Sequence, residues 1–220
     1  KQDLLGVGVP EENIHIVPNA IEDYWFERKP AEVLDRPSLV YLGRIGTDVF
    51  TLKLKGLDRL IDYYQHFQNT PKHTIGITMN NRLVDWCNRK IPNHHFYPNI
   101  KKEHIPDLLE DKYGSILLVT SRYEGFSLSL VEGMSQGLIP VIYPVGIAPE
   151  IIKSGKNGFL ITSQAEGKAV IGRLLRMPKG RRQRLAQSAQ ATAREFNSKT
   201  IGRRLLEVYG KTLKKQSLAI

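Results

Sequence analysis

Short apolar runs alternate with longer stretches of helical periodicity along most of this chain, and this alternation limits the folds open to it. Several of the runs are almost continuously apolar, which is typical of strands buried on both faces of a parallel sheet. Strand, helix, strand is therefore the repeating unit. The expected strands are residues 13–17, 38–43, 73–79, 94–97, 115–120, 139–143 and 158–161.

Helical periodicity fills the segments between these runs and changes character after Pro178. From that proline onward two helical segments are expected with no further strand, and Ser198 is expected to cap the second of them. The pattern predicts the α/β class, a Rossmann-like parallel sheet flanked by helices with a helical C-terminal tail. The expected helices are residues 56–67, 81–89, 101–110, 127–136, 164–177, 179–195 and 199–215.

The chain has 220 residues, 41% of them hydrophobic, which is enough for a substantial core. We expect a linker or tail over residues 1–12, a sheet domain over 13–177 and a helical extension over 178–220. The opening at Lys1 without methionine indicates a piece of something longer. Cys87 is the single cysteine, so no internal disulfide can form, and a reducing, cytoplasmic compartment is expected.

A formal net charge of +10 attracts anions of any kind, and many of the basic residues lie in the C-terminal part. Phosphorylated ligands, nucleic acid and the anionic inner face of a membrane all fit such a charge. A solvated basic surface without a partner fits it equally well.

Ligands of open parallel sheets bind beyond the carboxyl ends of the strands, so the loops after the apolar runs matter most. Arg44 follows the run SLVYLG, and a loop then carries Lys53 and Lys55 to the start of a helix. Cations beside a helix start can cradle a phosphate. The alternative is that these are surface charges, and Lys53 competes with Lys55 for the role.

The most informative segment is RYEGFSLSLVEGMSQGLIPVI, over residues 122–142. Glu124 and Glu132 are separated by seven residues, so the first lies in a loop and the second inside a helix. The first backbone amides of that helix, at Ser127, Leu128 and Ser129, have no helical partner and can meet an anion. A solvated Glu132 is the alternative interpretation.

Two further loops are weaker candidates. Tyr97 and Pro98 end one strand and could form a wall for a flat base, although packing without a ligand explains Tyr97 as well. Glu150 begins a short helical segment in GIAPEII, and the SGKNG that follows is expected to be only a turn.

Four segments in this order resemble the donor-binding domain of family-four GT-B glycosyltransferases. They are VPNAIEDYW, LVYLGRI with a later KGLDRLI, the segment with two glutamates, and GIAPEIIKSGKNGFLI. The resemblance covers residues 13–162 and, weakly, the tail. Departures are Ser127 in place of a common glycine, Gly133 in place of an alanine, Asn19-Ala20 in place of Asn-Gly, and a short insertion before Lys55.

The resemblance implies a retaining hexosyltransferase that uses a nucleoside diphosphate sugar, with UDP favoured and GDP next, and needs no cofactor or metal. It implies Glu124 beside the sugar, Glu132 on the ribose, the amides of residues 126–128 on sugar and phosphate, and Arg44 and Lys55 on the diphosphate. The implied catalytic set is Glu124, Arg44 and Lys55, and the expected binding set is Glu132, Gly125, Phe126, Ser127, Leu128, Ser129, Tyr97 and Pro98.

The acceptor implied by the resemblance is a glycan or lipid-linked sugar of the cell envelope, held mainly by an N-terminal domain that this chain lacks. The chain alone is therefore expected to bind donor without catalysing transfer, and nucleic acid is not expected as a partner. The alternatives are a GT-B sugar-nucleotide epimerase, whose nucleotide loop is typically more glycine-rich, and a non-enzymatic basic α/β binding module.

Overall fold

A computed structural model describes residues 2–28 and 32–217, and six parallel strands form one sheet within them. The order across the sheet is β3-β2-β1-β4-β5-β6, so the chain starts in the middle, winds to one edge and returns to build the other. The strands are β1 (Leu39–Arg44), β2 (Lys72–Ile77), β3 (His94–Pro98), β4 (Ile116–Val119), β5 (Ile139–Ile142) and β6 (Phe159–Leu160).

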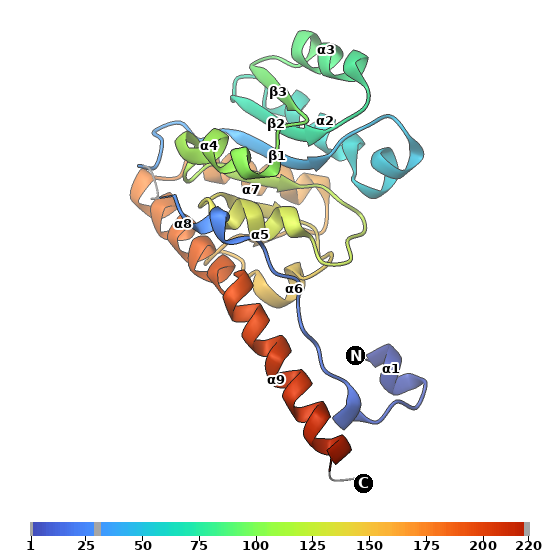
Figure 1. Ribbon diagram of the computed structural model, residues 1–220. Helices are drawn as coiled ribbons and strands as arrows, with labels where there is room; N and C mark the ends of the chain where they lie inside the picture. The colour runs from blue at the N-terminus through green and yellow to red at the C-terminus, as the bar shows by residue number, and fades with distance from the viewer. Residues whose placement is uncertain (1, 29–31, 218–220) are drawn as a thin grey trace.

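Helices cover both faces of the sheet, as Figure 1 shows. Alternate residues of each strand point to opposite faces, so Leu39 and Tyr41 join one apolar cluster and Val40 and Leu42 join the other. The helices are α1 (Gln2–Gly6), α2 (Leu57–His66), α3 (Asn81–Lys90), α4 (Ile105–Leu109), α5 (Leu128–Ser135), α6 (Ala148–Ile151), α7 (Gln164–Leu175), α8 (Lys179–Arg194) and α9 (Ser198–Ser217).

Each helical layer has its own members. Helices α2, α3 and α7 bury apolar side chains in the first cluster, and α4, α5 and α6 do so in the second. Helix α8 contributes Leu185 and Ala186 to the first cluster and Ala189 and Ala193 to the second. It therefore packs as part of the sheet domain, whereas α9 projects away from it (Figure 1).

The predicted α/β fold is confirmed, and the six strands expected from residue 38 onward are all present within one or two residues of their predicted ends. The strand expected over residues 13–17 is wrong. That segment follows a short 3-10 helix, η1 (Glu11–Asn13), and joins no strand of the sheet in the described residues. Alternating apolar residues form a strand only where their backbone lies beside a sheet edge, and this segment instead runs beside α9, away from the sheet (Figure 1).

The linker over residues 1–12, which contains α1, and the extension over 178–220 stay predictions, and the ends of both ranges lie outside the described residues. Two local predictions need correction. The helix expected over 101–110 is divided into η4 (Lys102–His104), α4 and η5 (Glu110–Lys112), with Pro106 in the first turn of α4. Asn197, not Ser198, caps α9, because its Oδ1 accepts a hydrogen bond from the Thr200 amide at 2.8 Å.

Candidate functional site

Lys55 and Glu124 meet beyond the carboxyl end of β1. The Lys55 ammonium lies 2.7 Å from Glu124 Oε1, and the Ser121 hydroxyl donates to the same oxygen at 2.6 Å. Both charged side chains are largely shielded, with 25% and 12% of their surface exposed. Lys53 is exposed, and its carbonyl accepts a hydrogen bond from Arg122. The structure therefore brings Lys55, rather than Lys53, to the glutamate.

The loop that carries Lys55 reaches Glu124 because its backbone at Gly56 packs closely against the backbone at Thr120. Residues 50–54 form a π-helical turn, η3 (Phe50–Leu54), and Gly56 follows with a φ of 65°. A Cβ at Gly56 would lie 2.1 Å from the Thr120 carbonyl oxygen. The Thr120 hydroxyl in turn donates to the Lys55 carbonyl at 2.9 Å. Glycine at residue 56 thus allows the backbone approach that positions Lys55.

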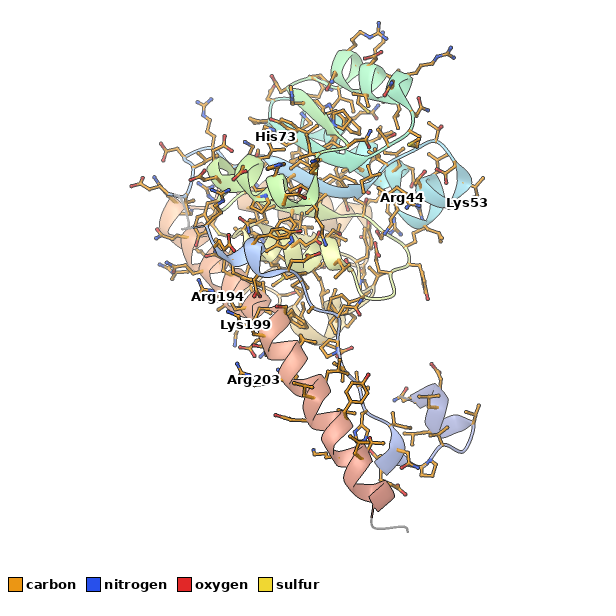
Figure 2. The ribbon with its side chains drawn as sticks, in the orientation of Figure 1. Arg44, Lys53, His73, Arg194, Lys199 and Arg203 are labelled. Atoms are coloured by element: carbon orange, nitrogen blue, oxygen red, sulfur yellow. The ribbon has the colours of Figure 1, made fainter. Side chains whose placement is uncertain are left out.

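Arg44 is the last residue of β1 and lines two neighbouring hollows. Figure 2 shows it at the same end of the sheet domain as Lys53. One hollow, of about 830 Å³, lies between the loop after β1 and the start of α3. The other, of about 200 Å³, is bounded by the ends of β1 and β2, the loop after β3, and α5. Ser129 and Glu132 of α5 line this smaller cavity together with Arg44.

The first turn of α5 lies between Glu124, which belongs to the preceding loop, and this cavity. Ser127 precedes the helix with a φ of 79°, a conformation that favours glycine. Its hydroxyl is buried and has no hydrogen-bond partner among the described residues. Phe126 is fixed because its carbonyl accepts from the Ile147 amide at 3.0 Å and its ring packs on Phe196. The left-handed backbone at residue 127 gives a physical reason for the glycine that is common at this position in the family it resembles.

Glu132 is buried in α5, with 6% of its surface exposed, so the solvated interpretation is wrong. Its Oε1 lies 2.9 Å from the Lys102 ammonium, which also contacts both carboxylate oxygens of Glu22 at 3.0 Å. Burial raises the pKa of Glu132 above its ordinary value, although Lys102 opposes the shift. The structure thus places a shielded carboxylate at the wall of the small cavity.

Lys102 and Glu22 were not identified from the sequence. Lys102 follows the strand-end loop FYPNI by two residues, which was the only signal for it. Glu22 lies in an irregular segment far from any strand end, and only the tertiary fold brings it to Lys102. Burial alone would raise the pKa of Glu22, but the hydrogen bond and charge of Lys102 lower it.

The expected aromatic wall lies elsewhere in the structure. Tyr97 packs against the rings of His73 and His95, at centroid distances of 6.1 Å and 4.3 Å. Neither Tyr97 nor Pro98 is among the residues that line the small cavity, whereas Ile100 from the same loop is. The wall at this point is aliphatic.

Gly125 and Phe126 border a third hollow, of about 700 Å³, on the other side of the loop before α5. Glu150 of α6 and Arg204 of α9 also line it, so the segment expected to be a weaker candidate lies beside the main one. Gly146 is left-handed at φ 55°, and a Cβ there would lie 2.5 Å from the Phe126 carbonyl oxygen. Glycine at residue 146 therefore allows the close approach of the two loops, which the hydrogen bond from the Ile147 amide to the Phe126 carbonyl holds together.

These residues form an ordered strip over the carboxyl edge of the sheet. Arg44 and Lys55 supply positive charge, the first amides of α5 point outward from the helix, and the carboxylates of Glu124 and Glu132 flank them. Cations and free amides stabilise an anion, and carboxylates accept hydrogen bonds from hydroxyl groups. The arrangement suits an elongated ligand with a central anion and hydroxyl groups on either side.

Comparison with known structures identifies the same fold elsewhere. A glycosyltransferase from Rickettsia africae superposes with a TM-score of 0.77 at 18% identity, covering 97% of this chain and 61% of that one. The Anabaena protein HepE, solved in complex with UDP and glucose, gives 0.72 at 20% identity, covering 95% and 60%. Both are similar to the present chain in fold.

Sequence comparison adds a curated relative and a family. The relative is an MMP alpha-(1->4)-mannosyltransferase of Mycolicibacterium hassiacum, 26% identical over 96% of this chain and 51% of its own length. The chain thus spans about half the length of this relative. The family described as Glycosyl transferases group 1 matches residues 25–192, which include the whole strip of candidate site residues from Arg44 to Glu150. The chain belongs to the Glycosyl transferases group 1 family.

Proposed function

We propose that this chain is the donor-binding part of a retaining hexosyltransferase that uses a nucleoside diphosphate sugar, with UDP favoured and GDP next. The observation that carries the proposal is the order of groups at the sheet edge, where Lys55 and Glu124 are paired at 2.7 Å and Arg44 and the buried Glu132 share one cavity. The name of the mannosyltransferase relative and the UDP and glucose bound to HepE support a hexosyl donor.

In this proposal the diphosphate lies against Arg44, Lys55 and the first amides of α5. Glu132 accepts hydrogen bonds from the ribose hydroxyls inside the cavity, and Ile100 lies along the base. Glu124, oriented by Lys55 and Ser121, accepts hydrogen bonds from the sugar hydroxyls. Gly125, which has no atom within 4 Å of a built Cβ, leaves room beside the sugar.

The transfer breaks the bond between the anomeric carbon and a diphosphate oxygen and forms one between that carbon and an acceptor oxygen. The acceptor proton passes to the departing diphosphate. Arg44 and Lys55 stabilise the charge that grows on the diphosphate as the sugar becomes oxocarbenium-like. Attack from the face that the diphosphate leaves retains the configuration, so Glu124 and Glu132 act as binding groups and not as the acid and nucleophile of a hydrolase.

The acceptor, a glycan or a lipid-linked sugar, is proposed to bind a second domain of the same protein, N-terminal to this one. Exposed apolar side chains on α9 and near α1 fit this proposal, because they offer a surface for such a domain: Leu4, Leu5, Val7, Leu206, Tyr209 and Leu213. Figure 1 shows α9 and the N-terminal segment projecting from the same end of the sheet domain. The chain alone is therefore expected to bind donor and not to catalyse transfer.

The site of action is proposed to be the cytoplasmic, anionic face of a membrane. Within the described residues, no helix combines the length and apolar character needed to cross a bilayer. Figure 2 shows Arg194, Lys199 and Arg203 along one side of the junction between α8 and α9. Such a basic face would attract anionic lipid headgroups and bring the enzyme to a lipid-linked acceptor.

Thermal unfolding with UDP, GDP, ADP and their hexose conjugates tests the donor site. A nucleotide at about 100 times its dissociation constant stabilises the folded chain by about 2.7 kcal/mol. Glu132→Ala and Arg44→Ala should each reduce that stabilisation, because they remove the ribose acceptor and a diphosphate cation. Arg173→Ala, an exposed arginine on α7, is the control and should leave the stabilisation unchanged. A wild-type chain that no nucleotide stabilises would contradict the proposal.

A further inference from the structure

One cation holds two carboxylates at the small cavity. The Lys102 ammonium lies 2.9 Å from Glu132 Oε1 and 3.0 Å from both oxygens of Glu22. The three side chains differ in exposure, with 8% of Glu132, 40% of Lys102 and 50% of Glu22 accessible. Glu132, which lines the cavity, is therefore the most buried of the three side chains, and the Lys102 ammonium lies between Glu132 and the more exposed Glu22.

We propose that Lys102 is a positioning residue that makes this cavity selective for ribonucleotides over deoxyribonucleotides, by keeping Glu132 an ionised acceptor directed at the ribose hydroxyls. The inference rests on the proposed function, since it concerns how the same cavity recognises the nucleoside. It adds a residue that neither the strand-end pattern nor the position of the two glutamates identifies.

The physical reason is the cost of a buried charge. A carboxylate with 6% exposure loses most of its hydration, and a hydrogen-bonded cation offsets that loss. An ionised carboxylate has acceptors only, so two neighbouring ribose hydroxyls can both donate to it. A protonated carboxyl group turns one of its oxygens into a donor and accepts only uncharged, weaker hydrogen bonds, so it would distinguish ribose from deoxyribose poorly.

The groups that face Glu132 come from several elements. Lys102 precedes α4, Glu22 and Tyr24 belong to the segment around η2 (Asp23–Phe26), and Arg44 lines the same cavity from β1. Burial would lower the pKa of Lys102, but its bonds to Glu132 and Glu22 raise it, so the ammonium stays charged over the working pH range. Burial raises the pKa of Glu132 even with Lys102 in place. Removing the cation would therefore shift protonation of Glu132 to higher pH.

Glu22 has a supporting part in this arrangement. It accepts from Lys102 and so fixes the ammonium at the cavity mouth, while the Ile21 amide next to it is held by the Phe196 carbonyl at 2.9 Å. Glu22→Gln keeps a hydrogen-bond acceptor and removes one charge. It should leave the ribose preference of the wild type largely intact, in contrast to a change at Lys102.

The test compares Lys102→Met with Lys102→Arg, and with Lys101→Met as a control at an exposed neighbour. Calorimetric titrations between pH 6 and pH 8.5 use UDP, 2′-deoxy-UDP, GDP and 2′-deoxy-GDP. The wild type, Lys101→Met and Lys102→Arg should prefer the ribonucleotide by roughly tenfold at every pH, as expected for one charged hydrogen bond. Lys102→Met should still bind through the diphosphate but lose most of that preference at pH 6 and regain it as the pH rises.

The two proposals fail in different ways. If the wild type binds a diphosphate and Lys102→Met keeps the full ribose preference with a flat pH profile, the role of Lys102 is overturned and the proposed function stands. If the wild type binds none of the four diphosphates, the proposed function fails and the role of Lys102 fails with it. Equal melting temperatures of Lys102→Met and Lys101→Met establish that the difference is in binding and not in folding.

Discussion

Gly56 shows how much a single residue contributes to the site. Its φ of 65° is left-handed, and a Cβ would meet the Thr120 carbonyl at 2.1 Å, so the residue must lack a side chain for two separate reasons. The loop that carries Lys55 to Glu124 depends on this approach. Ser127, by contrast, is left-handed at φ 79° without being glycine, so the backbone at the start of α5 is strained.

Gly56→Ala should therefore lower the free energy of unfolding by more than the ~1–2 kcal/mol of left-handed strain, because the clash with Thr120 adds to it. Gly155→Ala is the matched control, since Gly155 has a φ of 81° but no atom within 4 Å of a built Cβ. Chemical denaturation of both variants measures the difference. Equal losses of stability in the two variants would mean that the close approach at Gly56 is not required.

At the scale of elements, the β2 and β3 edge contains a histidine pair that makes the fold sensitive to acid. Burial lowers the pKa of His73 and of His94 from 6.5 to about 4. His94 Nε2 lies 2.8 Å from the Thr74 hydroxyl, and the Nδ1 atoms of both histidines are buried without a partner among the described residues. A second proton on either ring would therefore place a positive charge in a buried site where the Nδ1 atom has no hydrogen-bond partner among the described residues.

Because the folded state binds these protons more weakly than the unfolded chain, stability should fall as the pH drops from 6.5 to 4. The expected loss is up to ~3 kcal/mol for each of the two histidines at pH 4. Urea unfolding across this range gives the free energy of unfolding as a function of pH. That free energy should fall less steeply with acid in His73→Gln/His94→Gln than in the wild type or in His15→Gln, where the substituted histidine is exposed. Carboxylates titrate in all three proteins. If the free energy of unfolding depends on pH equally in all of them, the acid sensitivity belongs to the carboxylates and not to His73 and His94.

At the scale of the whole molecule, part of the net charge of +10 lies near the junction of α8 and α9, on the other side of the view in Figure 2 from Arg44. Arg194, Lys199 and Arg203 are exposed around the end of α8 and the start of α9 (Figure 2). Each basic residue near an anionic membrane contributes ~1 kcal/mol of binding. The position of the charges, more than their sum, should decide how the molecule meets a membrane.

Vesicles with anionic lipid should therefore bind the chain at low salt and release it at high salt. Arg194→Gln/Lys199→Gln/Arg203→Gln should weaken binding by about a hundredfold, given ~1 kcal/mol for each residue. Arg173→Gln/Arg176→Gln/Arg181→Gln removes the same charge from α7 and the start of α8 and should weaken it much less. Co-sedimentation with vesicles measures the binding of both triple variants. Equal losses of binding in the two variants would show that only net charge matters. A wild-type chain that does not bind at low salt would remove the membrane from the proposal.

The sequence by itself determined the architecture, because periodicity and strand burial are local properties. Six strands and the helices between them were predictable from apolar runs, and the spacing of Glu124 and Glu132 placed one in a loop and one in a helix. Arg44 and Lys55 were recognisable as cations at strand and helix ends. The predicted strand over residues 13–17 is wrong because strand pairing depends on where the fold places a segment relative to a sheet edge, which no local pattern reports.

Only the tertiary structure decided what surrounds these residues. It brought Lys55 rather than Lys53 to Glu124, placed Ile100 rather than Tyr97 at the small cavity, and buried Glu132 beside Lys102. It also joined Glu22 to Lys102, eighty positions apart. Such pairings arise because the winding of the chain across the sheet brings distant residues together. The charge state and orientation of a buried carboxylate therefore depend on the folded molecule and cannot be read from the residues next to it in sequence.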